Sequence, residues 1–388
     1  MRGPSSAPLA ESLRLSLFLA TVLLAFVSQI PAVIVAGSAL CGLYAWVGRS
    51  PSPPHWGAAA LFALACLLFF PAFVNLHHGL SPIFYFFATV AAFFAAQAVS
   101  RKPLRVVLRA YRWIYWASVV AIAAILYTYW GFPEPFGMVI EGSSTNGIPA
   151  YLIVLQIGLS LCTYAATARL PVLTPFITGA VAFYGNGRGS LVVAGLIIAV
   201  TFVLNLMPSG GRPSRLSWRL FFVLAAAAAG VALALYGDEF LELVTRYTKL
   251  SVGLVDTNRL EIWDHYAARI NPYTFFMGAD YAGTVIDYQY RGNPHIAYIR
   301  THSFFGLAVT LLAMLSPLLV LFVRKTLSAK LVFFSLIGLA ALRATSEPIF
   351  FPTLLDLFYF SYFFIYLHHV PAPAAVPMRA STESAGVA

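Results

Sequence analysis

The stretch FYGNGRGSLVVAGLIIAVTFVLNLM, residues 183–207, sets the character of the whole chain. From Gly189 to Met207 no side chain is charged, and an apolar run of this length spans the hydrocarbon core of a bilayer as an α-helix. Directly before the run, Arg188 stands between Gly187 and Gly189. The stretch therefore predicts a transmembrane helix that begins beside a permanent cation, and it raises the question of what that cation binds.

The rest of the chain repeats this pattern. Of its 388 residues 60% are hydrophobic and 10% are charged, whereas a soluble domain has about 25% charged residues. The apolar residues form blocks of about 16 to 22 residues, which is the length of a transmembrane helix. The chain is therefore predicted to be an all-α polytopic membrane protein with about 12 transmembrane helices. We expect them at 13–29, 30–48, 57–76, 79–99, 112–131, 149–168, 170–184, 189–207, 217–236, 303–323, 328–345 and 350–368.

The net charge is +10, and the distribution of the basic residues is typical of membrane topology rather than of a nucleic-acid-binding surface. With both termini in the cytoplasm, the basic cluster 101–112 and most other Lys and Arg residues lie on the cytoplasmic side, as the positive-inside rule requires. The remaining basic residues lie at or beyond the outer face: Arg188, Arg246, Lys249, Arg259, Arg269, Arg291, Arg300 and Arg343. Topology does not require these residues, so they are the first candidates for function.

The predicted spans divide the chain into four parts. Residues 1–236 hold the first nine helices, 237–302 form a large outer loop, and 303–368 hold the last three helices. Residues 369–388 are rich in Ala, Pro and Ser and are predicted to be a disordered cytoplasmic tail.

The large outer loop is predicted to contain a short amphipathic helix that lies over the membrane. In its sequence, Asn258 and Glu261 match a capping box at a helix start, and Asn271-Pro272 is typical of a helix end. One face of this helix is predicted to carry Leu260, Trp263, Ala267 and Ile270. After the helix come Tyr281, Tyr288, Tyr290 and Tyr298, which fit either an interfacial aromatic belt or a surface on which sugar rings stack.

Two arginines stand at predicted helix starts on the outer side of the membrane. Arg259 opens the amphipathic helix, where the macrodipole favours anions and disfavours cations. Arg188 lies at the start of a transmembrane helix, and its flanking glycines are expected to let a ligand approach the backbone closely. Arg188 also fits a snorkelling interfacial residue. Together the two guanidinium groups and the backbone N–H groups beside them are suited to a diphosphate.

Further polar groups lie near this face. His302 stands where the outer loop re-enters the membrane, and a neutral imidazole there is either structural or a general base. Arg343 and Glu347 are four residues apart and are expected to pair across one helical turn. We interpret His77-His78 as a tight outer turn. The sequence has no Gly-rich nucleotide loop and no metal-ligand spacing, so we expect no cofactor and no metal.

Three segments, in this order, resemble the O-antigen ligase and O-antigen polymerase superfamily of bacterial envelope glycosyltransferases. They are GNGRGSLVV (185–193), TNRLEIWDHYAARINPYTFFMGADYAG (257–283) and THSFFGLAVTLLAM (301–314). The resemblance implies a metal-independent transfer at the periplasmic face of the inner membrane, from an oligosaccharide on undecaprenyl diphosphate to an acceptor glycan or glycolipid. It implies that Arg188 and Arg259 hold the diphosphate and that His302 assists the acceptor hydroxyl.

The candidate residues follow from both lines of argument. The candidate catalytic residues are His302, Arg188 and Arg259, and the candidate substrate-binding residues are Arg188, Arg259, Arg291, Arg300, Tyr288, Tyr290 and Trp263. The ligase pattern usually has a glycine after the histidine, where this chain reads LLAML. This favours a polymerase of O-antigen or exopolysaccharide units, with flippase and chain-length regulator proteins as partners. The alternatives are an O-antigen ligase and, in another class, a transporter or a non-catalytic polysaccharide-export component.

Overall fold

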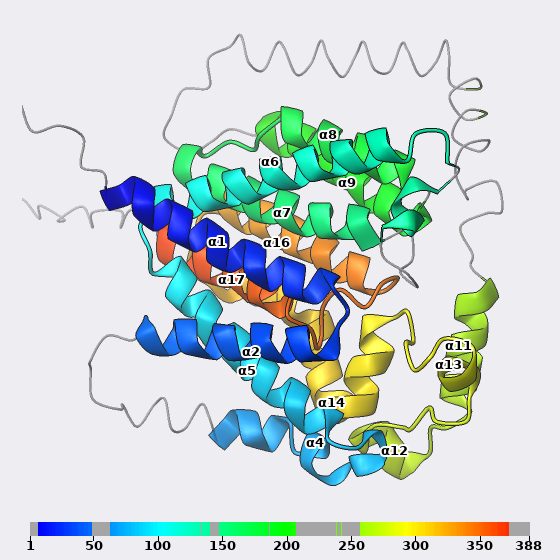
Figure 1. Ribbon diagram of the computed structural model, residues 1–388. Helices are drawn as coiled ribbons and strands as arrows, with labels where there is room; N and C mark the ends of the chain where they lie inside the picture. Colours follow the sequence, from blue (N-terminus) through cyan, green and yellow to red (C-terminus); the bar gives the residue numbers. More distant parts are fainter. Residues whose placement is uncertain are drawn as a thin grey trace, which may run out of the picture.

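The computed structural model describes residues 7–48, 63–132, 134–139, 147–185, 187–206, 238, 242 and 257–371. Every regular element of these residues is a helix, which confirms the predicted all-α class (Figure 1). The helices are α1 (Ala7–Val27), α2 (Pro31–Val47), α4 (Pro71–Val74), η1 (Leu76–His78), α5 (Ser81–Ser100), α6 (Leu104–Thr128), η2 (Pro135–Met138), α7 (Gly147–Thr167), α8 (Leu173–Tyr184), α9 (Arg188–Leu206), α11 (Thr257–Ala267), α12 (Pro272–Met277), α13 (Val285–Tyr288), α14 (Ala297–Leu315), η4 (Ser316–Leu318), α15 (Leu319–Phe322), α16 (Leu327–Ala344) and α17 (Asp356–His369).

Seven stretches of the described residues are helical, long and apolar enough to cross a membrane, which identifies a membrane protein. They are Pro8–Val27, Ser81–Ser100, Leu104–Thr128, Gly147–Thr167, Arg188–Leu206, Ala297–Phe322 and Leu327–Ala344. The predicted spans at 170–184 and 350–368 correspond to α8 and α17, which have 12 and 14 residues and are shorter than the roughly 20 needed to cross. The predicted span at 217–236 and the tail beyond 371 lie outside the described residues.

Helix α7 lies at the centre of the bundle and packs against α6, α8, α16 and α17 (Figure 1). Most of α7 is buried, including the polar side chains of Gln156 and Ser160, which are hydrogen-bonded to each other at 2.7 Å. Gly158 lets α6 approach, because a Cβ atom there would lie 2.2 Å from the ring of Tyr111. Small residues bring transmembrane helices together in this way, and the close contact holds the bundle that carries the site.

Two helices begin where the apolar pattern did not predict. Helix α14 starts at Ala297, before the predicted start at 303, and it is kinked at Gly306, whose φ angle is +74°. Helix α17 starts at Asp356, because Pro348 and Pro352 interrupt the preceding segment and the Asp356 carboxylate accepts hydrogen bonds from the backbone N–H groups of Phe351 and Thr353. The segment 345–355 between α16 and α17 is therefore an irregular connection.

The segment 257–296 caps one end of the bundle, opposite the end at which α1 begins and α17 ends (Figure 1). Its first helix, α11, differs from the prediction in its buried face. The predicted apolar face is exposed, with Leu260 at 51% and Trp263 at 47%, whereas Ile262 and Tyr266 are buried at 1% and 2%. The packed face of α11 was therefore predicted incorrectly, because contacts with α13 and α14 rather than the apolar pattern decide it.

The dipeptide Asn271-Pro272 begins a helix rather than ending one. Helix α11 already ends at Ala267, and α12 starts at Pro272. The Asn271 side chain accepts hydrogen bonds from the N–H groups of Tyr273 and Thr274, while Thr274 Oγ1 accepts one from the Asn271 N–H at 2.8 Å. Asparagine at the N-cap followed by proline at the first helical position is a favoured helix start.

Candidate functional site

Two segments that are far apart in the sequence meet at the carboxylate of Glu347. Its Oε1 atom lies 3.9 Å from Nη2 of Arg343 and 4.0 Å from Nη2 of Arg259. Arg343 is 1% exposed and Glu347 is 7% exposed, so this is a buried ion pair. The predicted pairing of Arg343 with Glu347 across one turn is confirmed, and α11 joins it through Arg259.

The start of α9 belongs to the same network. Arg343 donates hydrogen bonds from Nη2 to Ser190 Oγ at 2.9 Å and from Nη1 to Ser346 Oγ at 2.7 Å. A Cβ atom at Gly189 would lie 2.6 Å from Ser346 Oγ. The glycine after Arg188 therefore makes room for the end of α16, and the expected approach of a ligand to the backbone at Gly189 is wrong.

The structure thus brings the starts of α9 and α11 to one buried network. Arg188 is the residue before Gly189, and Arg259 lies at the carboxylate that Arg343 also contacts. In this network the guanidinium groups of Arg259 and Arg343 share the carboxylate of Glu347. Guanidinium groups bind phosphate oxygens bidentately, and a partly buried setting strengthens such contacts.

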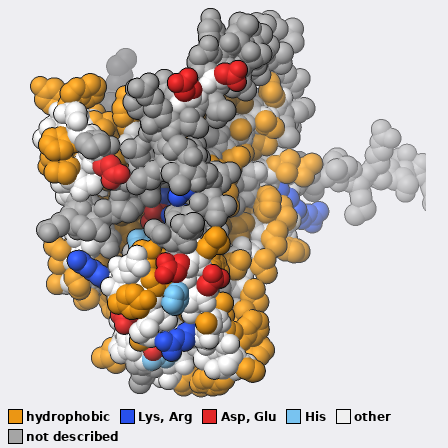
Figure 2. Space-filling view, turned by 90° about the vertical axis from the view of Figure 1, so that its right-hand side faces the viewer, with side chains coloured by type: hydrophobic (Ala, Val, Ile, Leu, Met, Phe, Trp, Pro, Cys, Tyr) orange, Lys and Arg blue, Asp and Glu red, His pale blue; other side chains and the backbone are white. Residues whose placement is uncertain are grey.

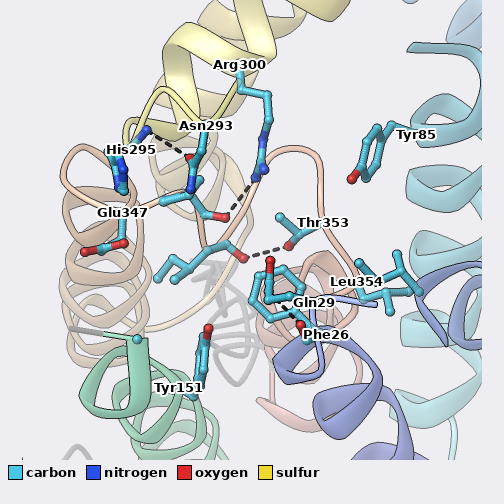
Figure 3. A pocket seen from close by; sticks show the side chains of 14 residues that line it. Phe26, Gln29, Tyr85, Tyr151, Asn293, His295, Arg300, Glu347, Thr353 and Leu354 are labelled. Carbon is cyan, nitrogen blue, oxygen red and sulfur yellow. Dashed lines mark hydrogen bonds between the residues drawn. The ribbon is translucent and has the colours of Figure 1, made fainter. Parts of the chain in front are cut away.

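Glu347 also lines a cavity of about 220 Å³ (Figure 3). Arg300, Asn293 and His295 border it on one side, and Tyr151 and Tyr85 come from α7 and α5. The complete lining is Phe26, Gln29, Ile34, Tyr85, Gly147, Tyr151, Asn293, His295, Arg300, Glu347, Pro348, Ile349, Thr353 and Leu354. The mixture of amide, imidazole, guanidinium, carboxylate and phenol groups suits a ligand with many hydroxyl groups.

Arg300 is held at the edge of this cavity. Its Nη2 atom donates a hydrogen bond to the carbonyl oxygen of Pro348 at 2.8 Å. Its Nε atom is buried and has no hydrogen-bond partner among the described residues. A buried donor without an acceptor costs about 1–3 kcal/mol, so a ligand oxygen at this position would stabilise the site.

One face of α11 connects this network to His302. Arg259, Ile262 and Tyr266 have the i, i+3, i+7 spacing of one helical face. Ile262 and Tyr266 are buried, and Tyr266 lies about 10 Å further along the axis than Arg259. Its hydroxyl lies 2.7 Å from Nδ1 of His302. One face of α11 therefore contacts Glu347 through Arg259 and His302 through Tyr266.

Both ring nitrogens of His302 are engaged. Nε2 lies 2.8 Å from the carbonyl oxygen of Phe275, which only accepts, so Nε2 is the protonated nitrogen. Nδ1 of the neutral ring then accepts from the hydroxyl of Tyr266. Burial raises the pKa of Tyr266, so its hydroxyl keeps the proton that it donates. His302 is 7% exposed and does not line the cavity.

The residues after His302 form the surface on which α12 and the residues after it lie. Ser303 Oγ donates to the carbonyl oxygen of Ala279 at 2.5 Å. A Cβ atom at Gly306 would lie 2.3 Å from the carbonyl oxygen of Phe276, and one at Gly278 would lie 2.3 Å from that of His302. The stretch 301–306 is therefore packed by its backbone as well as by its side chains against 275–279.

The remaining candidate substrate-binding residues lie outside the cavity. Trp263 is 47% exposed, Tyr288 is 70% exposed, and Arg291 is exposed with a φ angle of +51°. Tyr290 is half-buried, with its ring 5.2 Å from that of His295, and so lies behind one cavity residue. Figure 2 faces this end of the molecule and shows charged and histidine side chains gathered on it, where the exposed charged residues include Glu261, Asp264, Arg269, Asp287 and Arg291.

A second cavity, of about 360 Å³, lies between α5, α14 and α17 and is almost entirely apolar. Phe305, Val309 and Leu312 line it, and the buried carboxylate of Asp356 is at its edge. Thr301 is one of its lining residues and directly precedes His302. An apolar space of this kind, next to the polar end of the bundle, is suited to a hydrocarbon chain.

Sequence reasoning missed several cavity residues. Asn293, Tyr85, Tyr151 and Gln29 come from separate segments, and none stands in a motif whose spacing points to a binding site. Comparison of the chain with protein-family models, with curated proteins and with solved structures found no match.

Proposed function

We propose that this protein is a glycosyltransferase of the bacterial inner membrane that uses undecaprenyl-diphosphate-linked oligosaccharides at the periplasmic face. In this proposal the segment 257–296 is periplasmic and both termini are cytoplasmic. The donor repeat unit is moved to an acceptor glycan, which makes the protein a polymerase of O-antigen or exopolysaccharide units. The observation that carries the proposal is the meeting of α9 and α11 at the ion pair of Arg343 and Glu347, where Ser190 contacts Arg343 and Arg259 contacts Glu347.

The proposed reaction makes one glycosidic bond and breaks one bond to the lipid diphosphate. The acceptor oxygen attacks the anomeric carbon, the bond from that carbon to the diphosphate oxygen breaks, and the acceptor proton passes to a base. Negative charge builds on the departing diphosphate. Guanidinium groups already in position stabilise this charge more in the transition state than in the ground state. Arg188 and Arg259 are the proposed diphosphate ligands, and His302 is the proposed base.

The two cavities support a division of the substrate. The polar cavity beside Glu347 and Arg300 offers hydrogen-bond partners for sugar hydroxyl groups. The apolar cavity beside Thr301 offers room for part of a polyprenyl chain. The arginine network reaches the polar cavity through Glu347, so a diphosphate bound at the network would lie beside the sugar in this proposal.

A reconstituted transfer assay tests the proposal. The purified chain is placed in proteoliposomes with a radiolabelled polyprenyl-diphosphate repeat unit and one of two acceptors, a second donor molecule or lipid A-core. Products that grow by whole repeat units support the polymerase. Transfer to lipid A-core instead supports the O-antigen ligase, the alternative within the family. If the donor stays intact or only crosses the bilayer, the proposed enzyme is wrong, and a non-catalytic export component or transporter takes its place.

A further inference from the structure

A cluster of metal-ligating side chains lies outside the site described above. His77, His78 and Asp280 each have one donor atom within 4.8 Å of the donor atoms of the other two. The two histidines belong to η1, and Asp280 follows α12, so residues far apart in the sequence meet here. None of the three lines the polar cavity. We propose that this cluster binds one divalent transition-metal ion of the zinc type.

The geometry fits such an ion after a small adjustment. Nε2 of His78 lies 3.9 Å from Oδ1 of Asp280. Ligand atoms at about 2.0–2.1 Å from a tetrahedral zinc ion are roughly 3.3 Å apart. The side chains therefore need to close by less than about 1 Å for this pair. Two imidazoles and one carboxylate favour zinc and similar ions over magnesium or calcium, which prefer oxygen ligands alone.

Neighbouring groups hold the two partly buried ligands, His78 and Asp280, in place. The His78 ring lies between the rings of Tyr281 and Phe304, at centroid distances of 4.5 and 5.0 Å. Its Nε2 atom is 2.6 Å from Ser303 Oγ, so an ion at Nε2 would take the place of this hydrogen bond and of the proton on Nε2. Oδ1 of Asp280 accepts a hydrogen bond from the N–H of Ala282 at 2.8 Å. The ring contacts of His78 and this hydrogen bond of Asp280 orient the two ligands.

The third ligand, His77, is on the surface of the protein. His77 is exposed, and its ring lies 4.6 Å from that of His78 between centroids. Solvent can therefore reach the cluster and fill the coordination position that the three side chains leave open. A bound ion would join η1 to the segment after α12. The side-chain amide of Asn75, just before η1, already donates a hydrogen bond to the carbonyl oxygen of Met277, the last residue of α12. The ion would thus fasten the segment that also contacts His302.

Zinc binding to the full chain tests this site directly and does not depend on transfer activity. The protein is purified in detergent through an affinity tag without histidine, treated with a chelator and desalted. Competition with a chromophoric zinc indicator then measures stoichiometry and affinity, with Mg²⁺ as the comparison ion. We expect one zinc ion per chain and no competition from Mg²⁺. Absence of zinc binding, or equal binding of Mg²⁺, would overturn the proposal.

The variants His77→Ala and Asp280→Asn test whether the bound zinc ion is held by this cluster. His77 is exposed, and Asn at 280 keeps an oxygen acceptor for the N–H of Ala282, so both variants are expected to fold. Each should weaken zinc affinity by more than about 10- to 100-fold, because the loss of even a group that only orients a ligand costs that much. His265→Ala, which removes a histidine paired with Glu261 on the same face, is the control and should keep one tight zinc ion. Equal affinity in all four proteins, or the same loss in the control, would place the zinc elsewhere.

Thermal unfolding gives a second readout. Zinc that binds the folded chain raises its unfolding temperature. We expect this rise in the unaltered protein and in His265→Ala, and no rise in Asp280→Asn. A rise of the same size in Asp280→Asn would overturn the assignment. Failure of the zinc site would leave the transfer assay unaffected, so the two proposals are tested separately.

Discussion

The hydroxyl of Tyr266 lies 2.7 Å from Nδ1 of His302, and this hydrogen bond joins α11 to the first turns of α14. Both side chains are buried, at 2% and 7% exposure. Because Arg259 is on the same face of α11 as Tyr266, the bond also sets the distance between the arginine network and the histidine. The position of α11 on the bundle therefore depends on two contacts of one helical face, Arg259 with Glu347 and Tyr266 with His302.

Replacing Tyr266 by Phe removes this contact with little change of shape. Nδ1 of His302 would remain buried without a partner, which costs about 1–3 kcal/mol. We expect a lower unfolding temperature in detergent. The control is Tyr288→Phe, because Tyr288 is 70% exposed and a surface change of this kind stays within about 0.5 kcal/mol. Equal stability of the two variants would show that the bond does not hold α11.

The change Glu347→Gln should destabilise the fold more strongly. Arg343 is 1% exposed, and removing the charge of its carboxylate partner leaves an uncompensated cation inside the protein. Breaking a buried pair in this way costs about 3–5 kcal/mol. The free energy of unfolding in detergent measures it. Glu261→Gln alters an exposed pair with His265 and should change stability by less than about 1 kcal/mol. Similar losses of unfolding free energy in the two variants would show that Glu347 is not part of a buried ion pair.

Arg259→Ala separates activity from stability. If Arg259 holds the diphosphate, transfer in proteoliposomes should fall on the order of 10²- to 10³-fold. Its side chain is 26% exposed, so the unfolding temperature should change much less than in Glu347→Gln. Arg269→Ala removes an exposed arginine from the same segment and is expected to keep its activity. Unchanged activity of Arg259→Ala would remove this residue from the proposed mechanism.

Gly306→Ala should disturb the contact between α12 and α14. At Gly306 the φ angle is +74°, and a Cβ atom would lie 2.3 Å from the carbonyl oxygen of Phe276. The conformation alone costs about 1–3 kcal/mol for another residue, and the close contact adds to it. Gly338 in α16 has open space around it, so Gly338→Ala should be neutral or stabilise by about 0.5–1 kcal/mol. Thermal unfolding of both variants decides whether the kink needs glycine.

Local features of this fold were predictable from the sequence. The all-helical membrane class follows from composition, because apolar blocks of this length allow few other structures. The pairing of Arg343 with Glu347 follows from a spacing of one helical turn. Both depend on neighbours in the sequence. The exact spans were less predictable, since α8 and α17 are apolar but shorter than their predicted spans.

Features that depend on distant contacts were not predictable in the same way. The pattern of Leu260 and Trp263 indicated the wrong face of α11, because a helix that lies against a polar surface of the bundle can bury Tyr266 instead. The dipeptide Asn271-Pro272 is compatible with a helix end and a helix start, and the side chain of Thr274 decides between them. The link between α9 and Glu347 runs through Arg343, which no spacing in the sequence connects to Ser190.

The carbonyl oxygen of Phe275, 2.8 Å from Nε2 of His302, has a consequence for timing. In this conformation Nε2 carries a proton and the lone pair of Nδ1 accepts the Tyr266 hydroxyl. In the proposed transfer, proton uptake from a substrate therefore has to wait until Tyr266 turns away, because Phe275 of the six-residue α12 fixes the proton on the other nitrogen. An acceptor hydroxyl that took the place of Tyr266 at Nδ1 would make the base available only when the acceptor is bound, which would limit a wasteful transfer to water.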